Sequence, residues 1–328
     1  MSGALLVAAL REPKSVAALD GSGWNALIAA ARAERLIGTL ALRIDAALAP
    51  DGVRPILADA RQDAEREARQ ALWEADRAAE ALGGPVLLLK GTAYVAAGLK
   101  AGEGRFIGDL DILAPRERMD EVEAGLHAAG WEWVKQDDYD DAYYRQWMHE
   151  LPPMIHRERD RMIDVHHTIL PLTARQTPDA RALMKDAVAI TDRLSVLSPE
   201  DMVCHSVAHL LADGDLAGGL RNLWDIHCLL DNADAERLGV RAKGHGIGRH
   251  VAQAQRLAAA LYGGGRRQRL TVWDRLVIGR LLARDDWGRE TRKLLRFAFY
   301  IRSHWLRMPP TMLARHLFTK WRKGHRPV

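Results

Sequence analysis

Cysteine is nearly absent from this chain, because Cys204 and Cys228 are the only two among 328 residues. Two thiols exclude a disulfide framework and a cysteine-rich zinc site, and they are typical of a reducing compartment. Long hydrophobic runs are also lacking: no stretch of about 18 apolar residues occurs, so we expect no transmembrane helix. The short apolar run at the N-terminus lacks a basic leader and soon reaches Arg11 and Glu12, which predicts a helix and not a signal peptide. We therefore expect a cytoplasmic protein of bacterial type.

Acidic side chains are missing from residues 291–328, which contain ten Lys and Arg. The rest of the chain holds 37 Lys and Arg against 43 Asp and Glu, so its net charge is −6 although the whole chain is at +4. This basic tail also contains interleaved aromatic residues, namely Phe297, Phe299, Tyr300, Trp305, Phe318 and Trp321. Three interpretations remain open: a helix packed on the body with a basic solvated face, a nucleic-acid patch, or an amphipathic membrane-surface helix around 311–324. The acidic body favours the first, with membrane contact second.

The residue pattern along the chain changes twice, from helical to strand-like and back to helical, and the sequence contains no repeat or low-complexity linker. Residues 56–82 have no Gly or Pro and have helical apolar spacing, which predicts one long amphipathic helix ended by Gly83, Gly84 and Pro85. Strand-like segments follow at 86–90, 109–114, 131–135, 153–157 and 162–167, with a helix expected over 115–130. Ser198 and Pro199 then begin a helical region. The pattern predicts an α+β fold with a small mixed β-sheet, divided into a helical segment 1–81, a core 82–195 and a helical C-terminal domain 196–328 that ends in the basic tail.

Two aspartates stand one residue apart in the expected strand 109–114, whose sequence is DLDILA. Side chains alternate between the two faces of a strand, so Asp109 and Asp111 share a face while Leu110 and Ile112 occupy the other. Two neighbouring like charges repel each other and are costly to desolvate, so a divalent cation is the expected compensation. The simpler alternative is a solvated edge strand.

Three further features complete a candidate site. Asp164, in MIDVHH, would join the two aspartates if its strand lies beside 109–114, and three carboxylates can hold two magnesium ions. The sequence Lys90-Gly91-Thr92 lies where a strand turns into a helix, and such a turn can approach a phosphate closely. Arg105 could neutralise a triphosphate oxygen. The structural alternatives are a strand-end charge at Lys90, a loop charge at Arg105, and pairing of Asp164 with an arginine such as Arg161.

Several other polar residues have less specific patterns. His205 and His209 are four residues apart on a helix, a spacing that can bind zinc, but no glutamate follows His205 as in HExxH. They are expected in a polar network of the core, or lining the acceptor side of a cleft. Arg221 and Asp225 are interpreted as a helix-surface or interdomain ion pair. His166, on the face of Asp164, could orient that carboxylate.

In order, the segments LLLKG, Arg105 with DLDIL after three residues, and IDVHH resemble the polymerase-beta-like nucleotidyltransferase superfamily. More narrowly, they are similar to the bacterial uncharacterised nucleotidyltransferase family, as are LSPEDMVCHSVAHL at 197–210 and LRNLWDIHCLL at 220–230. The resemblance covers roughly residues 80–230 and, more weakly, the rest of the chain. This chain has Gly91-Thr92 where the superfamily has Gly-Ser or Gly-Gly, and a longer gap from Gly91 to Asp109.

The resemblance implies a nucleotidyltransferase core and metal-dependent transfer of NMP from an NTP, expected to be ATP, to an acceptor that it does not identify: a protein, a small molecule or RNA. It implies that Asp109, Asp111 and Asp164 are catalytic and bind two Mg²⁺ ions. Lys90, Gly91, Thr92 and Arg105 would bind the nucleotide. A second hypothesis is a non-catalytic regulatory partner, such as an antitoxin-like protein that keeps the fold for interaction.

Overall fold

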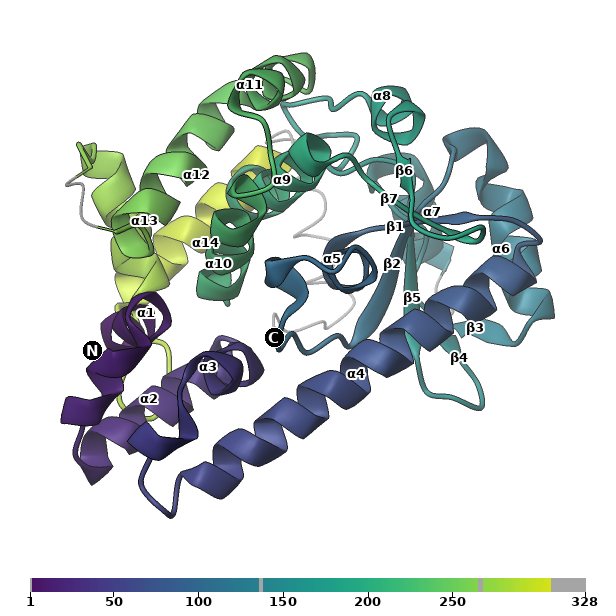
Figure 1. Ribbon diagram of the computed structural model, residues 1–328. Helices are drawn as coiled ribbons and strands as arrows, with labels where there is room; N and C mark the ends of the chain where they lie inside the picture. Colours follow the sequence, from purple (N-terminus) through teal and green to yellow (C-terminus); the bar gives the residue numbers. More distant parts are fainter. Residues whose placement is uncertain (1, 136–137, 265–267, 308–328) are drawn as a thin grey trace.

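A seven-stranded mixed sheet forms the centre of the computed structural model, which describes residues 2–135, 138–264 and 268–307 (Figure 1). Its strand order is β3-β4-β5-β2-β1-β7-β6. The β1–β7 and β2–β5 pairs are parallel and the other four pairs are antiparallel. The strands are β1 (Val86–Leu88), β2 (Asp109–Leu113), β3 (Trp131–Trp133), β4 (Met154–His156), β5 (Met162–His166), β6 (Val188–Ala189) and β7 (Leu194–Val196). The expected α+β class and mixed sheet are confirmed, and β6 and β7 are strands that the sequence pattern did not indicate.

Helices precede the sheet, connect its strands and follow it. The α-helices are α1 (Ser2–Arg11), α2 (Gly21–Ala33), α3 (Ile37–Arg43), α4 (Arg54–Ala81), α5 (Lys90–Ala96), α6 (Met119–Ala128), α7 (Asp138–Trp147), α8 (Ala180–Lys185), α9 (Pro199–Val207), α10 (Gly219–Leu230), α11 (Ala235–Gly244), α12 (Gly248–Leu261), α13 (Val272–Leu281) and α14 (Lys293–Arg307). The short 3-10 helices are η1 (Pro13–Ala18), η2 (Ala46–Leu48), η3 (Lys100–Gly102) and η4 (Arg116–Arg118), and η5 (Ala208–Asp213) is a π-helix.

The long helix α4 connects the N-terminal helices to the sheet, where it packs against β1, β2 and β7 (Figure 1). Its buried face consists mainly of alanine, which allows the helix to approach the sheet closely. Gly83 has a φ of +64°, a left-handed conformation that glycine adopts without strain, and it lies just beyond the helix end. The expected helix over 56–82 is therefore confirmed. The expected capped start at Ser198 is also confirmed, because its side chain accepts a hydrogen bond from the Asp201 amide.

Helices from the two ends of the chain pack against each other (Figure 1). Glu34, just after α2, accepts a hydrogen bond from Arg284 at 2.7 Å and another from the Leu220 amide at 3.1 Å. A Cβ atom at Gly3 would lie 2.7 Å from the Leu282 carbonyl oxygen, so only glycine permits this approach of α1 to the end of α13. The N-terminal helices and α10 lie on the side of the sheet where α5 lies (Figure 1), and both α5 and α10 contact η3.

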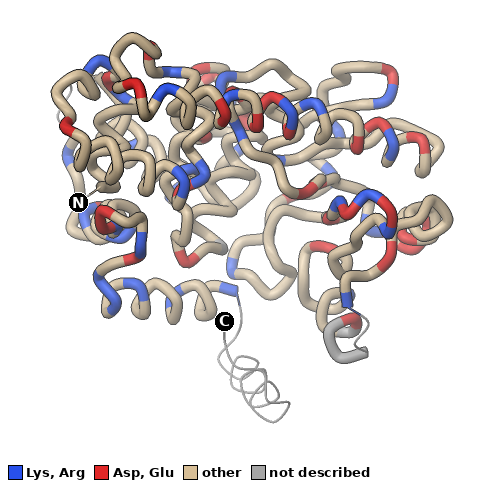
Figure 2. The backbone as a smooth tube through the Cα atoms, turned by 90° about the horizontal axis from the view of Figure 1, so that it is seen from below, with Lys and Arg blue, Asp and Glu red and all other residues tan. Residues whose placement is uncertain are grey.

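One face of α14 packs on the body, and its outward face carries both apolar and basic side chains. Phe299 and Ser303 are buried, and Phe299 stacks on Trp273. The exposed residues include Leu294, Phe297, Ile301 and Trp305, together with the Lys and Arg positions visible in Figure 2. Packing on the body therefore agrees with the first interpretation of the tail, but the solvated face is not simply basic. The membrane-helix interpretation around 311–324 falls outside the described residues. Within the described ranges, no helix is both long and apolar enough to cross a bilayer.

Candidate active site

The three aspartates converge because β2 and β5 are adjacent parallel strands in register. Asp111 is the direct partner of Asp164, and Asp109 is the partner of Met162. One carboxylate oxygen from each of Asp109, Asp111 and Asp164 lies within 4.8 Å of the others. The solvated-edge alternative is wrong, because β2 lies between β5 and β1 and its other face is buried. The strand of Asp164 therefore lies beside the strand of Asp109 and Asp111, as the predicted three-carboxylate site requires.

Asp111 is the buried centre of this cluster. Its Oδ1 accepts hydrogen bonds from Lys90 Nζ at 2.6 Å and from His166 Nε2 at 2.9 Å. The expectation that His166 orients Asp164 is thus wrong: the imidazole contacts Asp111, which lies diagonally opposite it on β2 because the parallel register pairs Asp111 with Asp164 and Leu113 with His166. Lys90 is not a simple strand-end charge either, since it neutralises a buried carboxylate.

The three carboxyl groups have different proton affinities. Burial would raise the pKa of Asp111, but Lys90 and the hydrogen bond from His166 outweigh it and hold that pKa well below its usual range. Burial, followed by repulsion from Asp111, raises the pKa of Asp109. Burial and the charges of Asp111 and Glu150 raise the pKa of Asp164 to about 7. Asp111 is therefore firmly ionised, whereas Asp109 and Asp164 hold their protons more strongly than usual and would release them more readily with a cation bound beside them.

Hard divalent cations fit this donor set. The ligands are carboxylate oxygens, which magnesium prefers. Asp164 Oδ1 is buried and accepts no hydrogen bond from any residue that the structure describes. Because a buried acceptor without a partner is costly, a cation bound to that oxygen would remove the penalty. Asp109, Asp111 and Asp164 are the residues that could hold it.

The turn from β1 into α5 has an unusual backbone. Lys90, the first residue of α5, has a φ of +48°, which is strained for a residue with a Cβ atom. This conformation accompanies the approach of its ammonium group to Asp111. A Cβ atom at Gly91 would lie 2.5 Å from Arg105 Nε, so glycine makes room for the Arg105 side chain. Thr92 is buried, and its hydroxyl has no hydrogen-bond partner in the described part of the chain.

Arg105 is held in a buried ion-pair network and not in a free loop. It pairs with Asp225, and Arg221 Nε donates to the other oxygen of the same carboxylate at 3.0 Å. Arg221 also donates to Thr39 Oγ1 at 2.6 Å and to the Ala101 carbonyl at 2.9 Å. The helix-surface interpretation of Arg221 and Asp225 is therefore wrong, since the pair is buried and links α10 with α3 and η3. Two guanidinium groups share one carboxylate, so the network keeps a net positive charge.

A cavity of about 320 Å³ opens beside Asp109 and Asp111, and residues from three distant parts of the chain line it. Its charged lining is Glu34, Arg35, Lys90, Arg105, Asp109, Asp111 and Arg221. The sequence analysis did not identify Arg35, because its role depends on the packing of the N-terminal helices beside the sheet. His209, on the π-helix η5, also lines the cavity, whereas His205 is buried in the core. π-helical turns are frequent at functional sites.

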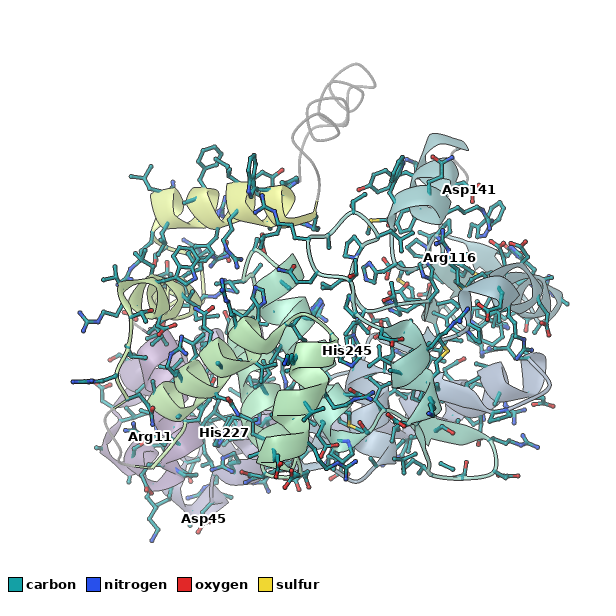
Figure 3. All side chains as sticks on the ribbon, turned by 90° about the horizontal axis from the view of Figure 1, so that it is seen from above. Arg11, Asp45, Arg116, Asp141, His227 and His245 are labelled. Carbon is teal, nitrogen blue, oxygen red and sulfur yellow. The ribbon has the colours of Figure 1, made fainter. Side chains whose placement is uncertain are left out.

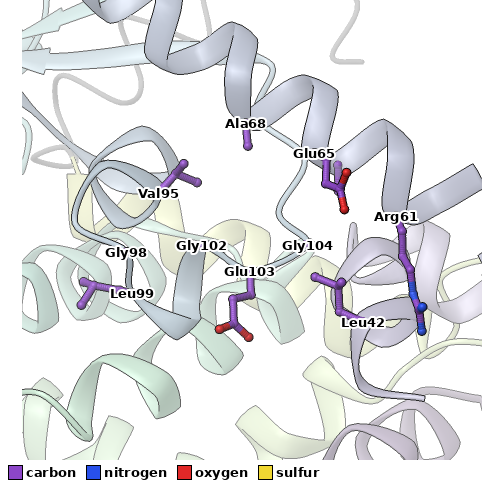
Figure 4. A pocket seen from close by; sticks show the side chains of 11 residues that line it. Leu42, Arg61, Glu65, Ala68, Val95, Gly98, Leu99, Gly102, Glu103 and Gly104 are labelled. Carbon is purple, nitrogen blue, oxygen red and sulfur yellow. The ribbon is translucent and has the colours of Figure 1, made fainter. Parts of the chain in front are cut away.

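A second cavity, of about 290 Å³, lies between α3, α4 and the segment that contains η3 (Figure 4). It shares no lining residue with the first cavity. Its walls are mostly apolar, with Arg61, Glu65 and Glu103 as the charged residues. No cluster of metal-ligating side chains lies in its described lining. Of these two cavities, only the first borders a cluster of metal-ligating side chains.

Comparison with known proteins agrees with this geometry. A family model described as an uncharacterised nucleotidyltransferase matches residues 20–263. The match includes α3 and α4 as well as the sheet and α10, so it extends on both sides of the span 80–230 in which the motifs lie. A search of curated proteins finds no match to the chain.

Proposed function

Since the chain belongs to the uncharacterised nucleotidyltransferase family, we propose that it transfers NMP from an NTP to an acceptor in a metal-dependent reaction. One observation carries this proposal. Three carboxylates from adjacent strands gather within 4.8 Å beside a cavity whose wall contains Arg35, Lys90, Arg105 and Arg221. A triphosphate with divalent cations needs this combination, because anionic ligands hold the cations and basic groups neutralise the phosphate oxygens.

The aspartates are assigned different tasks on the basis of their environments. Asp111, which stays ionised beside Lys90, would anchor the cations, with Asp109 and Asp164 completing their coordination. Bound divalent cations would stabilise charge on the reacting phosphate and favour deprotonation of the acceptor hydroxyl. Asp164 is proposed to help activate the acceptor hydroxyl, and its pKa of about 7 in the metal-free protein means that cation binding near neutral pH would displace its proton.

The basic wall would orient the triphosphate. Arg105 and Arg221 are fixed by Asp225, so little side-chain entropy would be lost when they bind phosphate oxygens. Thr92 offers a buried hydroxyl without a partner among the described residues, at the turn where the family motif lies. Because α10 and η5 supply Arg221 and His209, the segment 196–328 is proposed to complete a site whose metal ligands belong to the core 82–195.

The decisive experiment incubates the protein with magnesium and each α-labelled NTP, ATP first, in a lysate that supplies acceptors. The wild type is compared with Asp109→Asn/Asp111→Asn and with Glu132→Gln, a control that removes an exposed carboxylate of β3. Label should appear on an acceptor with the wild type and the control only. Transfer by the double variant at the wild-type rate would refute the proposal. Magnesium-dependent NTP binding without transfer would favour the non-catalytic regulatory hypothesis.

A further inference from the structure

A second cluster of metal-ligating side chains lies next to the three aspartates. It consists of His149, Glu150 and His166, and one ligand atom from each residue lies within 4.8 Å of the others. His149 and Glu150 belong to the segment between α7 and β4, and Glu150 forms an isolated β-bridge with His166 on β5. The side chains of His149 and Glu150 are 14% and 17% exposed, and that of His166 is 1% exposed. The cluster is thus largely shielded from water.

The hydrogen bond between His166 and Asp111 determines which ring nitrogen of His166 carries a proton. An ionised carboxylate only accepts, so His166 Nε2 must donate to Asp111 Oδ1. In the neutral ring, Nδ1 then presents a lone pair. That nitrogen is buried without a hydrogen-bond partner in the described chain and lies 3.3 Å from Glu150 Oε2. A second proton on the ring or a metal cation bound between the two atoms would satisfy both groups, and the position of His149 favours the metal.

The same Glu150 oxygen faces a second imidazole. His149 Nε2 lies 3.6 Å from Glu150 Oε2, and the rings of His149 and His166 are 5.2 Å apart between centroids. Ligands about 2.0–2.1 Å from a tetrahedral ion are separated by roughly 3.3–3.4 Å. The two nitrogen–oxygen separations are therefore close to the edges of such a tetrahedron. Two imidazole nitrogens and one carboxylate oxygen are typical zinc ligands, whereas magnesium prefers oxygen alone.

We propose that His149, Glu150 and His166 form a zinc-class metal site with an open fourth position, separate from the aspartate cluster. His166 would bind the ion through Nδ1 and donate through Nε2 to Asp111. A histidine ligand whose other nitrogen donates to a carboxylate is a recurring arrangement that fixes the imidazole and raises its basicity. Asp111 would then connect the two sites, because its carboxylate supports one ion through His166 and faces the other directly.

The test measures zinc binding in the full chain without nucleotide, so it does not depend on whether the proposed transfer occurs. Metal-stripped protein is titrated with Zn²⁺ against a fluorescent chelator, with millimolar Mg²⁺ present to compete at the aspartate cluster. We expect one tightly bound zinc per chain and a loss of affinity of at least about 100-fold in His149→Ala. His227→Ala is the control. His227 lies on α10 among the C-terminal helices, and Figure 3 shows it well away from Arg116, which indicates the side of the molecule that contains the sheet. That control should bind zinc as the wild type does.

The alternative location is tested directly by Asp109→Asn. Zinc that is lost in Asp109→Asn but retained in His149→Ala would place the ion at the aspartates and overturn the proposal. Unchanged affinity in His149→Ala would also overturn it. Where His149→Ala does not fold, X-ray absorption of the wild-type zinc complex decides: two imidazole ligands are expected, and an all-oxygen shell would refute the site.

Discussion

Replacing Asp164 by asparagine should stabilise the metal-free protein although it removes a residue assigned to the active site. Asparagine keeps the shape of the side chain and removes the charge. Asp164 ionises beside Asp111 and Glu150 in a mostly buried position, and the pKa of about 7 in place of 3.8 measures the cost of that ionisation. The wild type pays this cost at neutral pH and the variant does not.

The magnitude follows from the pKa difference. Each tenfold change in proton affinity corresponds to about 1.4 kcal/mol, so a pKa raised from 3.8 to about 7 costs at most about 4 kcal/mol at pH 8. Water that enters the site when it relaxes reduces the effective cost of a buried charge. We therefore expect the free energy of unfolding of Asp164→Asn to exceed that of the wild type by about 2 kcal/mol at pH 8.

The pH dependence has a definite sign. The folded protein keeps the Asp164 proton up to a pH of about 7, whereas the unfolded chain releases it near 3.8. Between these values the folded state binds more protons, so the wild type loses stability as the pH rises through this window. The advantage of Asp164→Asn should therefore be close to zero near pH 4, grow up to pH 7 and remain constant above it.

Urea denaturation at several pH values, with EDTA and then with magnesium, measures all of these effects. Magnesium should stabilise the wild type more than Asp164→Asn, because a cation compensates the charge that the variant lacks. Glu132→Gln serves as the control, since Glu132 is an exposed carboxylate of the same sheet. A variant that is no more stable than the wild type at pH 8, or whose advantage does not change with pH, would refute this account of Asp164.

Three further outcomes are expected. Asp111→Asn should lower NMP transfer by about 10³-fold or more, measured with labelled NTP, because Asp111 is the one cluster carboxylate held firmly ionised; a loss below tenfold would contradict its role. Lys90→Met leaves buried Asp111 without its closest cation, so urea denaturation in EDTA should show a free energy of unfolding lower by about 3 kcal/mol, part of which magnesium restores. An equal decrease with and without magnesium would contradict this coupling between Lys90 and the cation site. Gly91→Ala should lower the free energy of unfolding by about 1–3 kcal/mol, because its Cβ would lie 2.5 Å from Arg105 Nε. Gly84→Ala, with open space around its Cβ, should lower it less in the same assay, and equal decreases would show that the clash at Gly91 is relieved without penalty.

Local patterns were sufficient for the elements that carry the chemistry. The alternation in DLDILA placed Asp109 and Asp111 on one face of a strand, and α4 and the capped start at Ser198 followed from helix spacing and capping. These predictions succeeded because strand alternation and helix capping depend on residues that are close in sequence. The strands β6 and β7, of two and three residues, were missed, and both residues of β6 are exposed, so that strand has no buried face for a sequence pattern to show.

Local sequence patterns could not predict which residues the charged side chains contact. Lys90 and Arg105 were assigned to the nucleotide as isolated charges, yet Lys90 binds Asp111 and Arg105 binds Asp225, which is 120 residues away. The His166 hydrogen bond was assigned to the wrong aspartate. A strand pattern gives the face of a side chain, but the register between strands decides which neighbour it meets.

The sequence by itself determined the strand bearing the aspartate pair, the glycine turn before it and the family to which these motifs are similar. Only the tertiary structure decided that β2 and β5 are parallel neighbours in register, and that Arg35 and Arg221 line the same cavity as Asp109. The physical reason is that periodicity and capping are local, whereas a site with three carboxylates and a basic wall depends on how distant segments pack together. The same packing brings His149 and Glu150 to His166, although 15 residues separate Glu150 from His166 along the chain.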